Sequence, residues 1–420
     1  MTKGTHSRDA STPAGKPVKV LVFAHVPPPH HGQSYMVQLM LDGLRHAGDG
    51  ADRPVIECYH VDARISKELS DIGDFRLGKF LLLLWFCVKA VYYRFRYGVR
   101  NFYYIPAPGK RSALYRDWVV MGLCRPFFKN IILHWHAAGL AKWLETVVQI
   151  RTRLITFHFL KEADLSIVLS EYNRRDAEKL FAKRIAVVGN GIPDPCPEFE
   201  REVQPRRSAR RAVHAALLAG RTPAAAELAV AGEDAGVVRV LYLAHCTREK
   251  GLFDALSGVC LANAALAQRK SRLSLRMVVA GNFLSSREQQ EFEAEVVRLA
   301  CAASVEYQGF VGGEKKAKLL RDSDLFCFPT FYQNENQPVN LIEAMAFGLP
   351  VLTTRWRSLP ELLPANYPGL VPIQNPAAIS AAILLLLETH DGEGFRERFL
   401  KFYTLDRYLS ELAKAFESLG

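Results

Sequence analysis

Several features that define simpler classes of protein are absent from this 420-residue sequence. Its eight cysteines form no Cys-x-x-Cys pair and show no metal-ligand spacing, which favours free thiols in a reducing compartment. The first residues, MTKGTHSRDASTPAGK, are polar and contain no apolar signal core. We therefore expect a cytoplasmic protein, with attachment to the inner face of the plasma membrane as a second possibility.

The sequence also lacks motifs for dinucleotide or nucleic-acid binding. No Gly-x-Gly-x-x-Gly follows the first strand pattern, which argues against a dinucleotide-dependent dehydrogenase. Lysine and arginine (54) exceed aspartate and glutamate (43), giving a net charge of +11. This excess predicts an anionic partner such as a nucleotide diphosphate, a lipid phosphate or an anionic membrane face. Nucleic acid would also fit the charge, but no helix-turn-helix, zinc-finger or RNA-binding signature is present, so none is expected.

The length exceeds what one hydrophobic core usually accommodates and predicts two domains. Short apolar runs alternate with helical patterns in both halves, which predicts an α/β protein of two doubly wound, Rossmann-like domains facing across a cleft. The predicted segments are a tail (1–18), a first domain (19–197), an Arg/Ala-rich helical linker or insertion (198–236), a second domain (237–390) and terminal helices (391–420). The predicted strands cover 19–26, 55–61, 101–105, 130–135, 165–169, 184–188, 237–244, 275–280, 305–309, 325–329 and 351–354.

The most informative stretch runs from 325 to 354 and reads as strand, loop, helix, turn and strand. Pro338 is predicted as the first helical residue, because its missing N–H would have no partner there. The unpaired N–H groups near Val339 and Asn340 would then form an anion site that suits a diphosphate. Glu335 and Glu343 would lie near opposite ends of such a ligand, where carboxylates can accept hydrogen bonds from sugar hydroxyls.

This stretch resembles the signature of the retaining family 4 glycosyltransferases, which have the two-domain GT-B architecture. The matching elements are Glu335-x7-Glu343, Ala344-Met345-Ala346, Gly348 and Pro350-Val351. The resemblance implies transfer of a sugar from a nucleotide-diphosphate sugar, with retention and without a metal or other cofactor. By analogy, the acceptor is a glycan, such as a lipid-linked intermediate of bacterial polysaccharide synthesis. The alternatives are a GT-B nucleotide-sugar epimerase and a non-catalytic glycosyltransferase-like partner protein.

The resemblance also implies roles for residues outside this stretch. His136 ends a strand and would reach the donor sugar, and Glu343 would bind the ribose. Lys250 would neutralise the leaving diphosphate. The family usually has arginine where this chain has His245, so Arg248 is an alternative for that role. Gly32, in the loop after the first strand, would face the donor diphosphate or the acceptor.

Three motifs leave two interpretations open. The apolar core Phe80–Val88 is too short to span a bilayer, and the basic residues Lys89, Arg94, Arg96 and Arg100 lie within or beyond its helix. This helix could be plain core or could rest on an anionic membrane surface. His30 and His31 could be solvated loop residues or ligand contacts. Asp322-Ser323-Asp324 superficially matches a metal motif, but a structural role for the aspartates is favoured, and no metal site is predicted.

Overall fold

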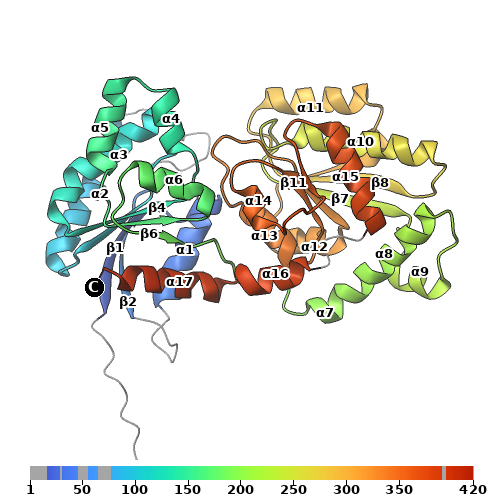
Figure 1. The fold of residues 1–420 in the computed structure, drawn as a ribbon, viewed down its shortest axis with the longest axis horizontal. Helices are drawn as coiled ribbons and strands as arrows, with labels where there is room; N and C mark the ends of the chain where they lie inside the picture. The colour runs from blue at the N-terminus through green and yellow to red at the C-terminus, as the bar shows by residue number, and fades with distance from the viewer. Residues whose placement is uncertain (1–16, 29–30, 46–54, 65–76, 390–393, 420) are drawn as a thin grey trace, which may run out of the picture.

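A computed structural model describes residues 17–28, 31–45, 55–64, 77–389 and 394–419. The predicted tail 1–18 and His30 therefore lie largely or wholly outside the described residues. Two six-stranded parallel sheets, one in each domain, form the centres of the molecule (Figure 1). This arrangement confirms the prediction of two doubly wound α/β domains.

The first sheet has the strand order β2-β1-β3-β4-β5-β6. Its strands are β1 (Val18–Ala24), β2 (Ile56–Asp62), β3 (Asn101–Tyr104), β4 (Asn130–Trp135), β5 (Leu165–Val168) and β6 (Ile185–Val187). The helices of this domain are α1 (Gly32–Arg45), α2 (Leu77–Arg96), α3 (Arg111–Cys124), α4 (Leu140–Thr146), α5 (Ile150–Leu160) and α6 (Glu171–Lys179), with a 3-10 turn at Arg125–Phe127. The central strands β3, β4 and β5 are largely apolar and buried because helices cover both faces of a doubly wound sheet.

The second sheet has the strand order β12-β11-β10-β7-β8-β9. Its strands are β7 (Val237–Leu243), β8 (Ser274–Ala280), β9 (Val305–Gly309), β10 (Leu325–Phe328), β11 (Val351–Thr354) and β12 (Leu370–Val371). Its helices are α10 (Leu252–Gln268), α11 (Ser286–Arg298), α12 (Gly313–Asp322), α13 (Val339–Ala346), α14 (Leu359–Leu362) and α15 (Pro376–Thr389), with a 3-10 turn at Ala302–Ser304. Most of the predicted strands agree with these bounds to within one or two residues.

Helix α1 begins at Gly32, where the Ser34 hydroxyl donates to the His31 carbonyl at 3.0 Å. One predicted helix start differs from the structure. The prediction that Pro338 is the first helical residue is wrong. Pro338 is the N-cap, with an extended ψ of 126°, and its carbonyl accepts the first hydrogen bonds of α13. An extended cap leaves Val339 as the first helical residue.

The segment between the domains is helical, as expected, and packs onto the second domain. It contains α7 (Phe199–Glu202), α8 (Gln204–Leu218) and α9 (Ala225–Ala231). Arg210 on α8 is buried and forms two hydrogen bonds of 2.7 Å with the Asp324 carboxylate at the start of β10. Asp322 pairs with Arg206 and Lys318 at 2.6 Å. The two aspartates of the Asp-x-Asp motif thus anchor α8 and α12, which is a structural role.

The chain crosses between the domains twice, at adjacent points. Ile192 N–H donates to the Tyr403 carbonyl at 2.9 Å, and Leu405 N–H donates to the Ile192 carbonyl at 2.8 Å. The last two helices, α16 (Phe395–Phe402) and α17 (Leu405–Glu417), run along one side of the molecule from the second domain to the first (Figure 1). Gly43 of α1 leaves room for the Leu409 side chain of α17. The final helix therefore returns to the first domain.

The Arg210–Asp324 pair generates a stability prediction. Arg210→Ala should lower the free energy of unfolding by about 3–5 kcal/mol, because it leaves the buried Asp324 carboxylate without its main partner. Arg206→Ala is the matched control, since its pair with Asp322 is partly exposed and its loss should cost at most about 1 kcal/mol. Urea denaturation followed by circular dichroism would measure both. Equal losses in the two variants would contradict the assignment of Arg210 as the anchor of α8.

Candidate active site

The carboxyl ends of the two sheets supply the loops that lie between the domains. In doubly wound sheets, ligands bind where the strand order reverses, outside the carboxyl ends of the strands. In the second domain these strands are β7 and β10, and in the first they are β1 and β3. Hydrogen bonds join the domains here: Asn336 donates to the Trp135 carbonyl at 3.3 Å, and Asn190 donates to the Gln337 carbonyl at 2.9 Å.

Lys250 and Glu335 form an ion pair between the loops that follow β7 and β10. The Lys250 ammonium lies 2.8 Å from the Glu335 carboxylate, and both side chains are largely buried. The Thr330 hydroxyl donates to the same Glu335 oxygen at 3.0 Å. The Lys250 ammonium also lies 4.5 Å from the centre of the Tyr332 ring, where a cation–π interaction adds to its attachment. The ion pair therefore holds one cation and one carboxylate in fixed positions at the switch point of the second sheet, where the strand order reverses between β10 and β7.

Close backbone contact between the two loops explains how this pair forms. Phe331 N–H donates to the Glu249 carbonyl at 2.9 Å, which joins the loops beside Lys250. Gly251 has a left-handed φ of 82°, and a Cβ there would collide with the Pro329 carbonyl. Only glycine adopts this conformation without strain and also permits such an approach.

The amino ends of α13 and α1 face each other across the domain boundary. A Cβ built on Gly32 would lie 3.8 Å from a methyl group of Val339, so the two helix starts are in near contact. Asn340 is tied to the second sheet, since its amide donates to the Leu243 carbonyl at 2.6 Å. Unpaired N–H groups and the helix dipoles favour an anion at such a position.

Glu343 lies one turn further along α13 and has a partner that the sequence did not reveal. Lys316 of α12 contacts the Glu343 carboxylate at 2.5 Å, and Glu343 is almost fully buried. Burial, followed by the negative charge of Glu343, raises the pKa of Tyr35 on α1. No sequence signal could have paired Lys316 with Glu343, because the two residues lie on separate helices.

Histidines line the first-domain side of this boundary. The His136 ring lies 4.3 Å from the His134 ring, and its Nε2 is buried without a hydrogen-bond partner among the described residues. Burial, with a smaller effect of His31, lowers the pKa of His136 to about 3. His31 Nε2 lies 2.8 Å from His25 Nε2, and burial together with Arg116 and Arg64 lowers the pKa of His25 to about 4. His25 and His136 are therefore neutral near pH 7.

Arg248 does not lie beside the Lys250–Glu335 pair. Its guanidinium stacks 3.9 Å from the centre of the Phe253 ring and pairs with Glu291 of α11 at 3.2 Å. His245 is the residue on the Lys250 side: burial and then the charge of Lys250 lower its pKa, which keeps this imidazole neutral. The family's usual arginine therefore has no charged equivalent here: His245 lies near Lys250 but is neutral, and Arg248 is charged but pairs with Glu291.

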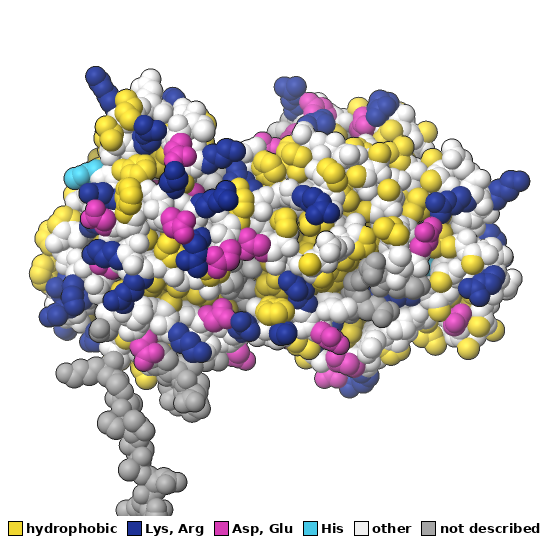
Figure 2. Space-filling view, viewed as in Figure 1, with side chains coloured by type: hydrophobic (Ala, Val, Ile, Leu, Met, Phe, Trp, Pro, Cys, Tyr) yellow, Lys and Arg dark blue, Asp and Glu magenta, His cyan; other side chains and the backbone are white. Residues whose placement is uncertain are grey.

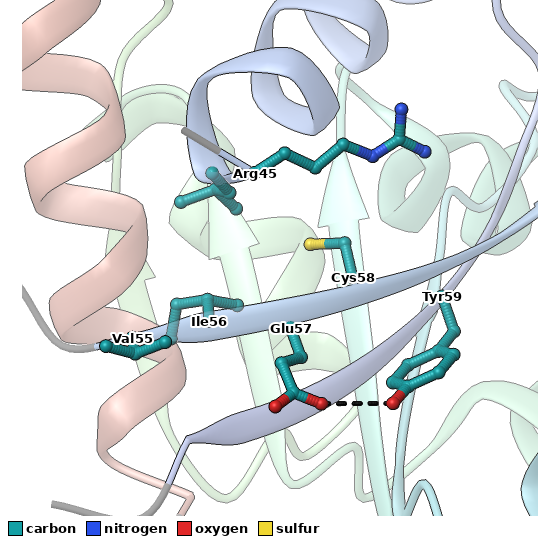
Figure 3. Close-up of a pocket in the computed structure, with 7 residues that line it drawn as sticks. Arg45, Val55, Ile56, Glu57, Cys58 and Tyr59 are labelled. Carbon is teal, nitrogen blue, oxygen red and sulfur yellow. Dashed lines mark hydrogen bonds between the residues drawn. The ribbon is translucent and has the colours of Figure 1, made fainter. Parts of the chain in front are cut away.

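A hollow lies at the outer edge of the first sheet, away from these loops. In Figure 3 the Tyr59 hydroxyl donates to the Glu57 carboxylate at 3.0 Å, along one face of the edge strand β2. No residue of the predicted site lines it. Its lining residues are Leu44, Arg45, Val55, Ile56, Glu57, Cys58 and Tyr59.

The two doubly wound domains have the GT-B architecture, and comparison with solved structures agrees. The chain superposes on sucrose-phosphate synthase from Thermosynechococcus elongatus with a TM-score of 0.65 and 19% identity, covering 96% of this chain and 99% of that one. It superposes on Anabaena Alr3699/HepE in complex with UDP-glucose with a TM-score of 0.62 and 13% identity, covering 95% and 99%. At these identities the likeness concerns the fold.

Sequence comparisons find similarity over part of the chain. Residues 238–389 match the model of the glycosyl transferases group 1 family. A comparison with curated proteins finds 28% identity over 160 residues with the amylovoran biosynthesis glycosyltransferase AmsK of Erwinia amylovora. The aligned part spans 37% of this chain and 37% of that relative, so the two proteins match over little more than a third of the length of each.

Proposed function

We propose that this protein is a retaining, family 4-type glycosyltransferase that transfers a sugar from a nucleotide diphosphate to a glycan of bacterial surface polysaccharide. The observation that carries the proposal is the Lys250–Glu335 ion pair at the switch point of a glycosyl transferases group 1 domain. Support for the donor class comes from HepE, whose structure holds UDP-glucose in the same fold. Support for the pathway comes from the name of the amylovoran relative.

Electrostatics supply the main catalytic effect in this proposal. The diphosphate lies beside the amino ends of α13 and α1, near Val339, Asn340 and Gly32, with Lys250 beside the leaving oxygen. These groups stabilise the charge that develops as the glycosidic bond breaks. Glu335, fixed by Lys250 and Thr330, accepts hydrogen bonds from sugar hydroxyls.

The first-domain histidine completes the sugar site. His136 is neutral, so it can donate or accept a hydrogen bond without placing a second positive charge beside Lys250. No divalent cation is required in this proposal, because Lys250 and the helix amides neutralise the diphosphate. Glu335 and Glu343 already have lysine partners, Lys250 and Lys316.

A panel of nucleotide sugars tests the proposal. A true donor should raise the unfolding temperature, since a ligand at 100 times its Kd adds about 2.7 kcal/mol to stability. Products should then be analysed for transfer to an acceptor or to water. Isomerised donor without transfer would indicate the epimerase alternative. Binding without any turnover would indicate the non-catalytic partner.

Glu343 should govern nucleotide binding. Glu343→Ala removes a carboxylate placed to accept the ribose hydroxyls and should weaken UDP or GDP binding by roughly 1–3 kcal/mol in calorimetry. Glu314→Ala, which removes an exposed carboxylate on α12, is the control and should bind like the parent. Parent-like binding by Glu343→Ala would show that the ribose assignment is wrong.

Glu335 and His136 should govern turnover rather than nucleotide affinity. Glu335→Gln and His136→Ala should each keep UDP or GDP binding and lower kcat for sugar transfer by at least roughly 100-fold, since both contact the reacting sugar. The exposed neighbour Glu249→Gln should retain the parent kcat. Full activity in either site variant would remove that residue from the sugar site.

A membrane-bound acceptor is the second part of the proposal, and α2 supports it. Five large side chains of this helix, spaced four and three residues apart, are 58–65% exposed and share one face: Leu81, Trp85, Val88, Tyr92 and Phe95. The opposite face, including Leu83, Cys87 and Ala90, is buried in the first domain. The helix thus has one buried and one exposed face, and the exposed face supports the proposal that it rests on an anionic membrane surface.

Basic residues lie beside this apolar stripe. Lys89, Arg94, Arg96 and Arg100 belong to α2 or follow it, and apolar and basic side chains lie together at the first-domain end in Figure 2. Within the described chain, every helix is too short or too polar to cross a bilayer. An apolar stripe with flanking cations suits attachment to an anionic leaflet, with about 1 kcal/mol from each basic residue.

Vesicle sedimentation tests the attachment. The protein should sediment with phosphatidylglycerol-containing vesicles at low salt and largely release at high salt. Trp85→Ser with Phe95→Ser, and separately Arg94, Arg96 and Arg100 changed to Gln, should reduce the bound fraction. The control Val297→Ser removes an apolar side chain that is 76% exposed on the second domain and should change nothing. Absence of vesicle binding, or equal binding to neutral and anionic vesicles, would favour a soluble acceptor or a protein partner.

A further inference from the structure

Arg357 lies at the domain boundary in a conformation that arginine rarely adopts. It follows β11, and its φ of 49° lies in the left-handed region. Non-glycine residues are held there at a cost in free energy, and such strain is concentrated at functional sites. The loop that holds it leads into α14, which faces the first domain in Figure 1.

The Arg357 guanidinium lies between the two loops of the sugar site. On one side, its Nη2 donates to Gln333 at 3.2 Å, in the same loop as Glu335. On the other side it packs against Gly139, in the loop that begins at His136, and a Cβ on Gly139 would collide with it. Gly139 itself has a φ of 93°, so this position favours glycine for both reasons.

The Arg357 guanidinium lies 5.3 Å from the centre of the Trp356 ring, but among the described residues it has no anionic partner. Arg357 Nε is buried without a hydrogen-bond partner, and no described carboxylate lies within ion-pair distance of Arg357 or of the neighbouring, exposed Arg355. A half-buried guanidinium is normally paired, because its donors lose water on burial.

The carboxylates around Arg357 are already engaged elsewhere. Asp176 accepts hydrogen bonds from Gly139 N–H at 2.7 Å and Ala141 N–H at 2.8 Å. Burial raises the pKa of Asp176, and the charge of Arg357 acts in the opposite direction. Glu361 accepts from Glu171 N–H and Tyr172 N–H, at the amino end of α6. Glu335 is neutralised by Lys250.

We propose that Arg357, assisted by Arg355, selects a substrate that carries an anionic group, a carboxylate or a phosphate, next to the reacting sugar. A guanidinium binds either group through two parallel hydrogen bonds, which gives both affinity and orientation. The group can come from the donor, as a uronic acid, or from the acceptor, as a phosphate near the glycan. This inference rests on the proposed glycosyl transfer, and it adds that the enzyme prefers a negatively charged substrate.

A variant that relieves the backbone strain tests this role without endangering the fold. Arg357→Gly removes the guanidinium and places glycine at a left-handed position, where it is favoured. Lys270→Gly is the matched control, because Lys270 is an exposed cation with a φ of 54° in the turn after α10. Arg357→Lys keeps the positive charge but lacks the planar guanidinium that can donate two parallel hydrogen bonds, so it should keep only part of the selectivity.

Two pairs of substrates separate the two sources of charge. UDP-glucuronate is compared with UDP-glucose as donor, and a sugar linked to farnesyl diphosphate is compared with the same sugar linked directly to farnesol as acceptor, through kcat/KM. The parent and Lys270→Gly should prefer the anionic member of one pair by roughly 10- to 100-fold, and Arg357→Gly should abolish that preference. UDP affinity should not change in any variant.

Three results would overturn the proposal. These are equal use of both members of each pair by an active parent, an unchanged preference in Arg357→Gly, and weakened UDP binding in Arg357→Gly, which would assign the guanidinium to the diphosphate. A parent that transfers no sugar from any nucleotide donor is a different result, because it would defeat the proposed glycosyl transfer itself.

Discussion

The contact between the loops after β7 and β10 is the constraint on which the candidate site depends. These are the strands at which the order of the second sheet reverses, and doubly wound sheets bind their ligands outside the carboxyl ends of such strands. Gly251 allows the two backbones to approach, and the Lys250–Glu335 pair then closes the contact. Because both charges are largely buried, their attraction is little screened, and it orients each group before any ligand arrives.

The second constraint is the double crossing of the chain between the domains. Ile192 and the segment at Tyr403–Leu405 are hydrogen-bonded to each other, and Arg396 pairs with Asp194 at 2.6 Å beside them. Two adjacent crossings restrict the relative motion of the domains more than one linker would. On the cleft side, Glu361 binds the amino end of α6 and Asn336 binds the carbonyl of Trp135. The carboxyl ends of both sheets are therefore held face to face.

Charge is divided unequally between the two sides of the domain boundary. The first-domain side has imidazoles, and burial lowers the pKa values of His25 and His136, so they are neutral near pH 7. The second-domain side has lysines paired with glutamates, and Arg357 after β11 without such a partner. An anionic ligand is consequently attracted mainly to the second domain, while the first can bind a neutral or weakly charged group at close range.

The sequence by itself determined the elements and the chemical types at the site. Alternating apolar runs and helical patterns predicted both parallel sheets, since strand and helix formation depend on local periodicity. The spacing of Glu335 and Glu343 predicted one carboxylate before and one after the start of a helix, because a residue's place relative to a helix start follows from its position in the sequence. The sequence placed the start of α13 one residue early, at Pro338, since ψ of the cap depends on the loop before it.

Only the tertiary structure decided which side chains meet. It directed Arg248 to Glu291, left His245 beside Lys250, and gave Glu343 its partner Lys316. It also anchored the arginine-rich segment on Asp324 and exposed one face of α2. Such pairings join residues far apart in the chain, and their geometry follows from how whole helices and sheets pack. Arg357 shows this most clearly, because neither its left-handed backbone nor its unpaired charge can be inferred from the residues beside it in the sequence.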